Sequence, residues 1–236
     1  LFATLQRNSD GAVALSFADG GTPFREAGNL PQLIDAWDRH LELPILSALT
    51  RVETQAVTLR YEDLRIGKAW TLDGGTVQLA RGGDSVEIEA GFSILSGREY
   101  ASTVEASYQS DIGDTAAEFT VMVDQVASSD IASQSPAFGW LDVLRAPISG
   151  ALQGAVDSDG ALMPLEASLE IGTGVIQPNE ALKPVPIRAA RSFFTFDPAR
   201  QELEFSNLSV DSAWVTGQME GRAELVGVRD GRLTDL

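Results

Sequence analysis

Few residues in this sequence are of a type that could do chemistry. His40 is the single histidine, cysteine is absent, and no serine lies in a G-x-S-x-G motif. A catalytic triad, or a metal site built on histidine and cysteine, needs more of these side chains than the chain contains. We expect His40 to lie near the C-terminus of a helix, where a positive charge is stabilising.

Two glycine-containing motifs have an ordinary structural interpretation. Residues 157–160 read Asp-Ser-Asp-Gly, like the start of a calcium-binding EF-hand loop, but Ser168 stands where the closing glutamate is required. We interpret these residues as a hairpin turn. Residues 172–174 read Gly-Thr-Gly without the lysine that a phosphate-binding loop needs. Neither motif therefore predicts a metal ion or a nucleotide cofactor.

The carboxylates are numerous, but their spacing is that of a solvated surface. Glu166 with Glu170, and Glu220 with Glu224, could be compared with the acid–base pairs of hydrolases. Both pairs occupy alternate positions of expected strands, where a wet face is the simpler explanation. A carbohydrate-active or hydrolytic site would need clustered carboxylates and aromatics, which the sequence does not assemble. We expect no catalytic residue and no enzyme.

Residues 124–150 interrupt the alternation of apolar and polar positions, and we expect a short helical element there. Pro136 suits a first helical turn. Asp124 with Gln125 either caps local backbone amides or forms a polar latch between the two flanking β-rich blocks. The expected junction residues are Asp124, Gln125, Pro136, Phe138, Trp140, Leu141, Leu144, Pro147 and Gly150.

The aromatic side chains of this junction have two interpretations. Phe138 and Trp140 either anchor a lipid or a partner, or cover the apolar face of the strands at the junction. We favour the cover, and expect Phe138, Leu141 and Leu144 to close the apolar face there.

Composition excludes several classes of function. The 236-residue chain has a formal net charge of −17, and 44% of its residues are hydrophobic. Such acidity repels phosphate backbones and anionic headgroups, which argues against nucleic acid and against charge-driven membrane docking. No apolar run approaches the ~20 residues of a transmembrane helix. The chain starts at Leu1 without a signal peptide, and we expect a piece of a longer protein.

Alternation with a period of two predicts antiparallel strands on short turns on both sides of the junction. A helix is expected at residues 31–40, and a turn at residues 73–75. A switch of parity predicts a β-bulge near Ser206 and Asn207.

Three regions are expected along the chain. Residues 1–29 would be the end of a preceding β unit. Residues 30–135 would be a helix plus a first β unit, and residues 136–236 a helix plus a second unit continuous with the first.

About eleven strands that are apolar on one face need a cover for that face. An unbroken sheet of this size would be about 50 Å wide, and would expose more apolar surface than soluble proteins usually leave. A sandwich, a barrel or a trough that holds an apolar ligand would solve the problem. Small residues suit a smooth-walled trough, but they also permit strong twist and close packing. They are Ala90, Ala106, Ala117, Gly150, Gly154, Ala167, Gly217, Gly221 and Ala223.

Several structural motifs resemble the AsmA-like superfamily of Gram-negative envelope proteins, most closely the YhdP-type members in their alphaproteobacterial forms. They are the Asp124-Gln125 pair, the 136–144 helix, the strand start at 146–150, the Gly160 hairpin and the strand end Phe-Thr-Phe-Asp-Pro at 194–198. The resemblance spans about residues 30–225, and no catalytic residue belongs to it.

This resemblance implies a mainly β fold, an elongated, twisted antiparallel meander that forms an open, repeating β-groove with short helices between repeats. It also implies a periplasmic protein anchored in the inner membrane that carries phospholipid toward the outer membrane. Expected partners are phospholipid acyl chains, neighbouring repeats of the same chain and both membranes, without nucleic acid. The alternative is a non-catalytic structural or interaction β-sandwich.

The groove would be lined by apolar residues that share one face of the strands. The candidates are Val86, Ile88, Phe92, Ile94, Val104, Phe119, Val121, Ile148, Leu152, Val156, Met163, Leu165, Leu169, Ile171, Val215, Met219 and Leu225.

Overall fold

The computed structural model describes residues 1–10, 12–17, 25–27, 48–95, 101–179, 181–226, 228–229 and 232–233, together with residues 32, 39 and 43. The expected helix at residues 31–40 therefore lies almost wholly outside the described residues, as does the side chain of His40. Among the helices that are described, none has the length and apolar character needed to cross a bilayer.

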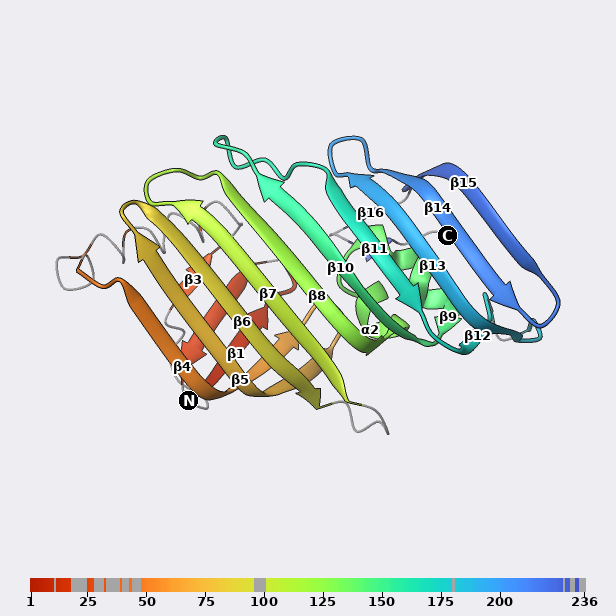
Figure 1. Cartoon of the computed structure of the whole chain (residues 1–236), viewed down its shortest axis with the longest axis horizontal. Helices are drawn as coiled ribbons and strands as arrows, with labels where there is room; N and C mark the ends of the chain where they lie inside the picture. Colours follow the sequence, from red (N-terminus) through yellow and green to blue (C-terminus); the bar gives the residue numbers. More distant parts are fainter. Residues whose placement is uncertain are drawn as a thin grey trace. The chain divides into compact units, whose positions relative to one another are not determined.

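The protein is mainly β, and its described strands form one open, mostly antiparallel sheet of 15 strands beside a separate pair (Figure 1). The strands are β1 (Phe2–Arg7), β2 (Val13–Phe17), β3 (Arg25–Ala27), β4 (Arg51–Asp63), β5 (Lys68–Gly82), β6 (Ser85–Leu95), β7 (Ser102–Asp111), β8 (Ala117–Ala127), β9 (Leu144–Arg145), β10 (Pro147–Val156), β11 (Leu165–Ile171), β12 (Gly174–Ile176), β13 (Val185–Asp197), β14 (Glu202–Ser212), β15 (Thr216–Glu224), β16 (Val228–Arg229) and β17 (Arg232–Leu233).

The hydrogen-bonded order of the sheet is β15-β14-β13-β11-β10-β8-β7-β6-β5-β4-β1-β2-β3, and β12 pairs with β13 and β9. The helical segments are α2 (Ser128–Ala132) and the 3₁₀ helix η1 (Pro136–Val143). Antiparallel meanders of this kind follow from the alternating sequence and its short turns. The expected all-β, open-sheet architecture is confirmed.

The chain divides into two compact units. Unit 1 is Leu1–Val121 with Ala155–Leu162, and unit 2 is Met122–Gly154 with Met163–Leu236. The division differs from the expected boundary at residue 136, because α2 and the last part of β8 belong to unit 2.

In unit 1, β1 departs from the antiparallel pattern. It pairs with β2 as a hairpin, and it runs parallel to β4, with Leu5 opposite Tyr61 and Arg7 opposite Asp63. A parallel pair requires a long crossover between its strands. The first residues of the chain are thereby hydrogen-bonded into unit 1.

The turn expected at residues 73–75 is wrong, because β5 runs through these residues. The register of β5 shifts between Asp73 and Thr76, and Gly74 has a φ of +62°. Glycine adopts this φ without strain, so a bulge takes up the extra residues. The chain instead reverses direction between Asp63 and Lys68, at the junction of β4 and β5.

In unit 2, the bulge expected near Ser206 and Asn207 is confirmed. β13 pairs Phe193 with Asn207 but Phe194 with Phe205, so Ser206 is the extra residue. The same shift appears between β14 and β15, from Phe205 to Leu208. The bulge keeps the apolar residues on both sides of it on one face of the sheet.

The turn at residues 157–160 has the hairpin geometry that the sequence predicts. The Asp157 carboxylate accepts hydrogen bonds from the backbone N–H groups of Asp159 and Ala161 at 3.0 and 2.8 Å. Gly160 has a φ of +81°, which favours glycine. The carboxylate of Asp157 therefore holds the turn together.

Candidate functional site

In unit 1, large apolar side chains of three neighbouring strands share one side of the sheet. β6 places Ile88 opposite Leu79 of β5, and Phe92 opposite Val104 of β7. Directly opposed residues in antiparallel strands point to the same side. All four side chains are half-buried, while Val86 at the start of β6 is only 2% exposed. We call this side of β5, β6 and β7 the unit 1 apolar face.

Phe92 is positioned by a glycine of the neighbouring strand. A Cβ atom at Gly75 would overlap the ring of Phe92, so the ring packs directly on the backbone of β5. Val57 of β4 is paired with Gly75 and is buried. The bulge in β5 thus fixes one of the largest side chains of the apolar face.

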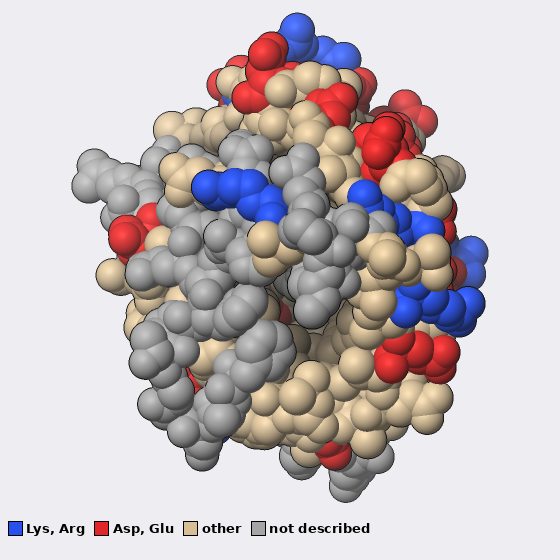
Figure 2. All heavy atoms as spheres, turned by 90° about the vertical axis from the view of Figure 1, so that its left-hand side faces the viewer, with Lys and Arg blue, Asp and Glu red and all other residues tan. Residues whose placement is uncertain are grey.

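The opposite side of unit 1 is charged and solvated. Acidic and basic side chains lie close together along the right-hand border of Figure 2. The ion pairs on this side of β4 include Arg51–Glu53 at 3.6 Å and Arg60–Glu62 at 2.6 Å. Exposed pairs of this kind each contribute little to stability, roughly 0–1 kcal/mol. Their main effect is to keep this side of the sheet in water.

A buried ion pair closes the end of β4. The Asp63 side chain is fully buried, and the guanidinium of Arg65 donates to both of its oxygens, at 3.1 Å from Nε and 2.6 Å from a terminal nitrogen. The backbone N–H of Arg65 adds a third bond at 3.0 Å. Such a fork is the strongest geometry for a carboxylate and a guanidinium.

This pair sets the electrostatics of its neighbours. Burial alone would raise the pKa of Asp63, but the hydrogen bonds and charge of Arg65, with the charge of Arg7, leave that pKa below its usual value. Burial, followed by the charge of Asp63, raises the pKa of Tyr61. The Tyr61 ring stacks on Trp70 with a centroid distance of 5.4 Å. Because these interactions satisfy one another, the cluster stabilises unit 1.

In unit 2, the junction segment covers the apolar side of the sheet, as Figure 1 shows for α2 and η1 behind β10, β11 and β13. The ring of Phe138 meets Phe194 edge-to-face at 6.1 Å. Trp140 meets Phe194 at 6.0 Å and Phe205 at 5.5 Å. Leu141 is completely buried, and Phe138 and Leu144 are 8% and 6% exposed. Phe138, Leu141 and Leu144 are thus all buried in unit 2.

Part of the expected groove is not open. Some predicted lining residues are at most 7% exposed and are buried by the chain itself, so they offer no open apolar wall. They are Val86, Ile148, Val156, Leu165, Leu169 and Ile171.

The other predicted lining residues divide into two groups. Met163 and Val215 lie just before β11 and β15, outside the strands, and are 47% and 63% exposed. Met219 lies within the edge strand β15 and is 57% exposed. The half-buried residues are Ile88, Phe92, Ile94, Val104, Phe119, Val121, Leu152 and Leu225.

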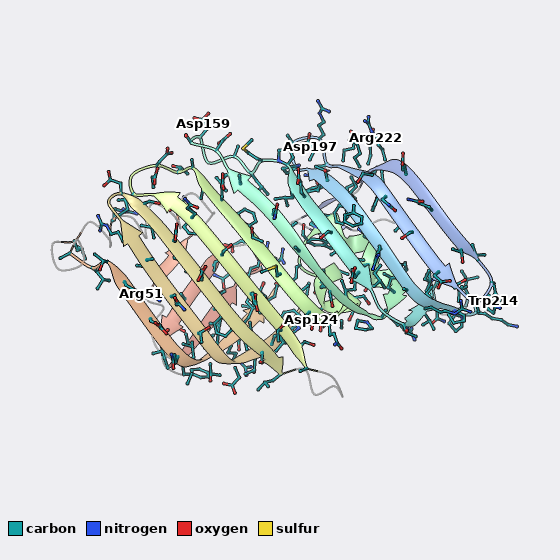
Figure 3. All side chains as sticks on the ribbon, viewed as in Figure 1. Arg51, Asp124, Asp159, Asp197, Trp214 and Arg222 are labelled. Atoms are coloured by element: carbon teal, nitrogen blue, oxygen red, sulfur yellow. The ribbon has the colours of Figure 1, made fainter. Side chains whose placement is uncertain are left out.

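Asp124 and Gln125 are both hydrogen-bonded to Ser149 of β10, and we call this contact the latch. The Ser149 hydroxyl donates to the Asp124 carboxylate at 2.6 Å, and its oxygen accepts the backbone N–H of Gln125 at 3.0 Å. Gln125 has a φ of +51°, which is costly for a residue with a side chain. Asp124 lies at the end of β8 that leads into α2 (Figure 3). The latch joins β8 to β10 within unit 2.

The remaining junction residues have local roles. Pro136 opens η1, where Ser135 Oγ accepts the backbone N–H of Ala137 at 3.3 Å. Pro147 opens β10, and its carbonyl accepts the N–H of Gly172 at 2.9 Å.

Replacing Ser149 with alanine should lower the free energy of unfolding by about 1 kcal/mol, because it removes a hydrogen bond to a charged acceptor and one to the strained Gln125 backbone. Urea denaturation followed by circular dichroism measures the change. Ser168→Ala, on the polar side of β11, is the matched control. Equal stabilities for the two variants would contradict the latch.

Among the described residues, no group of three or more His, Cys, Asp or Glu side chains is placed to hold a metal ion. Comparison with protein-family models, curated proteins and solved structures gives no match. The geometry itself offers one clear physical property, a row of half-exposed hydrocarbon side chains on unit 1. Such a surface favours contact with other apolar groups over water.

Two features of the structure were not predicted from the sequence. The Asp63–Arg65 pair gave a weak signal, two opposite charges around Leu64 at the end of a strand. Phe193 gave a clearer one, because it precedes Phe194 and so falls on the polar parity of β13. Its exposed fraction is 45%, whereas that of Phe194 is 4%.

Proposed function

We propose that the chain is a segment of a lipid-transfer protein whose open sheet shields phospholipid acyl chains between the inner and outer membranes of a Gram-negative envelope. In this proposal the longer protein is anchored in the inner membrane and extends through the periplasm. The supporting observation is the unit 1 apolar face, whose large side chains occupy neighbouring paired positions and are only half-buried.

An acyl chain lying across these paired positions would exchange water for hydrocarbon on both surfaces. Burial of apolar area contributes about 25 cal/mol per Å², or about 0.8 kcal/mol per methylene. The headgroup would stay in water beside the strands, so no buried charge is needed. A shallow face binds each lipid weakly, which a conduit requires because the lipid must move on.

Unit 2 supports a more limited role. Its apolar side is filled by Phe138, Trp140 and Leu141 of the chain itself, which leaves no surface for a lipid beneath η1. This observation favours the second candidate for unit 2, a structural module without cargo. If unit 2 also contacts lipid, its contribution is limited chiefly to the half-buried Leu208 and Val210, next to Met219 of β15.

Photo-crosslinking tests the proposal on two adjacent pairs of residues. Benzoylphenylalanine is placed at Phe92 or Val104 on the apolar face, and at Ser93 or Thr103 on the opposite side as matched controls. The purified chain is irradiated in the presence of phospholipid, and lipid adducts are measured by mass spectrometry. We expect adducts from Phe92 and Val104 and several-fold fewer from the controls.

Equal crosslinking from both sides, or no adduct and no co-purified phospholipid, would reject lipid binding by this face. The structural module would then be the better description of the whole chain.

A further inference from the structure

A hollow of about 390 Å³ opens on the polar side of unit 2, opposite the side that η1 covers. Its floor is formed by residues directly opposite one another on three neighbouring strands: Ala151 of β10 is paired with Ser168 of β11, and Ser168 with Phe193 of β13. Ala151 and Ser168 are small, and the bulge at Ser206 displaces the next strand. The space beside the Phe193 ring therefore stays unfilled.

Phe193 is not needed for the core of unit 2. Its neighbours Phe194 and Phe196 point to the other side and are 4% and 5% exposed, whereas Phe193 is 45% exposed. Aromatic residues make up only 7% of the chain. An exposed aromatic ring at the edge of a hollow is a common feature of binding surfaces.

One of the carboxylates around the hollow has no cationic partner among the described residues, unlike its neighbours on the same side of the sheet. On the same side of the sheet, Glu170 is paired with Arg191 at 3.1 Å, and Glu204 with Arg222 at 3.0 Å. Arg222 lies on β15 (Figure 3). Glu166, which lines the hollow, forms no ion pair or hydrogen bond with the described part of the chain. The hollow thus has a carboxylate for which the sheet supplies no cation.

We propose that this hollow binds an arginine side chain of a partner protein, with the guanidinium stacked on Phe193 and paired with Glu166. A planar guanidinium combines ring stacking with bidentate hydrogen bonding to a carboxylate. It would complete the series of carboxylate–arginine pairs that Glu170 and Glu204 form on the same side.

The acceptors at the hollow favour arginine over a lipid headgroup. Gln153 is paired with Glu166 across β10 and β11, and both line the hollow. A quaternary ammonium headgroup has no N–H to donate to such acceptors, while a guanidinium has five. The net charge of −17 further favours a cationic partner.

This site is independent of the proposed lipid function, because it lies in unit 2 and shares no residue with the unit 1 apolar face. A chain that bound no lipid would still bind arginine here, and the reverse is equally true. The two proposals therefore fail separately.

The test is an NMR titration of the isotopically labelled whole chain with the peptide acetyl-Gly-Arg-Gly-amide. The neutral peptide acetyl-Gly-Gln-Gly-amide is the probe control. We expect amide shifts centred on Ser168, Phe193 and Thr195, and an affinity at least about tenfold weaker in Glu166→Gln. Phe193→Leu should weaken binding while the chain remains folded, because this side chain is exposed.

Glu170→Gln is the matched control, since it removes an equal charge from the same side of β11 and should leave binding unchanged. Three outcomes would overturn the proposal: no shift at the residues of the hollow, equal shifts with the glutamine peptide, or equal losses in Glu166→Gln and Glu170→Gln. Larger shifts with phosphocholine than with the arginine peptide would also overturn it, in favour of a lipid headgroup.

Discussion

Replacing Asp63 with asparagine should lower the free energy of unfolding by about 3–5 kcal/mol. The carboxylate is fully buried, and the guanidinium of Arg65, whose side chain is 3% exposed, depends on it for both of its short bonds. The variant leaves a buried cation without its counter-ion. Urea denaturation of the wild-type and variant chains at neutral pH measures the difference.

Glu62→Gln is the matched control for this variant, because it removes the same charge one residue away. Glu62 is paired with Arg60 at 2.6 Å, but both side chains are partly exposed. Its loss should cost no more than about 1 kcal/mol. If the two variants were equally stable, the buried pair would not have the role assigned to it.

The same pair predicts a dependence on pH. The pKa of Asp63 is lowered in the folded chain by Arg65 and Arg7, although burial opposes the shift. A carboxyl group with a lowered folded pKa contributes its full stability above its unfolded pKa, about 3.9, and loses it as the pH falls through the folded value. The difference in stability between wild type and Asp63→Asn should therefore shrink below about pH 4. A constant difference across that range would contradict the assignment.

Replacing Gly150 with valine should destabilise unit 2 by about 3 kcal/mol. A Cβ atom at this position would overlap the carbonyl oxygen of Ser168 and lie 2.9 Å from Leu169 Cδ2. The carbonyl belongs to the backbone of β11, which is paired with Gly150 and with β13, so it has little freedom to move. Thermal unfolding followed by circular dichroism would report the loss as a lower Tm.

Gly221→Val on the edge strand β15 provides the comparison. A Cβ atom there meets nothing within 4 Å, and valine favours strands, so the change should stay within about 0.5 kcal/mol of neutral. Similar losses for the two variants would show that glycine is needed for strand flexibility in general, and not for close approach at Gly150.

The two units use the same one-sided strands in different ways. In unit 1, Ile88 and Phe92 remain half-exposed, while in unit 2 the equivalent side of β11 and β13 lies under η1. A transport function therefore rests mainly on unit 1. The exposed Phe193 on the other side of unit 2 adds a second, polar kind of contact.

The sequence by itself determined most of the long strands and which side chains share a face within each of them. Alternation is a local property of an extended chain, so Ile88 and Phe92 could be placed on one side without knowing their neighbours. The change of parity at Ser206 revealed the bulge for the same reason. The Asp-Ser-Asp-Gly turn at residues 157–160 was predictable because its hydrogen bonds join residues at most four positions apart.

Only the tertiary structure decided what lies over each face. Phe194 is buried against Phe138 and Trp140 of η1, and no local pattern in β13 distinguishes a strand that a helix covers from one that stays open. The fork between Asp63 and Arg65 likewise requires a buried turn that residues 62–66 alone do not specify. Burial is set by contacts between segments distant in sequence, and those contacts turned a uniform predicted groove into one half-exposed apolar face and one covered by its own junction.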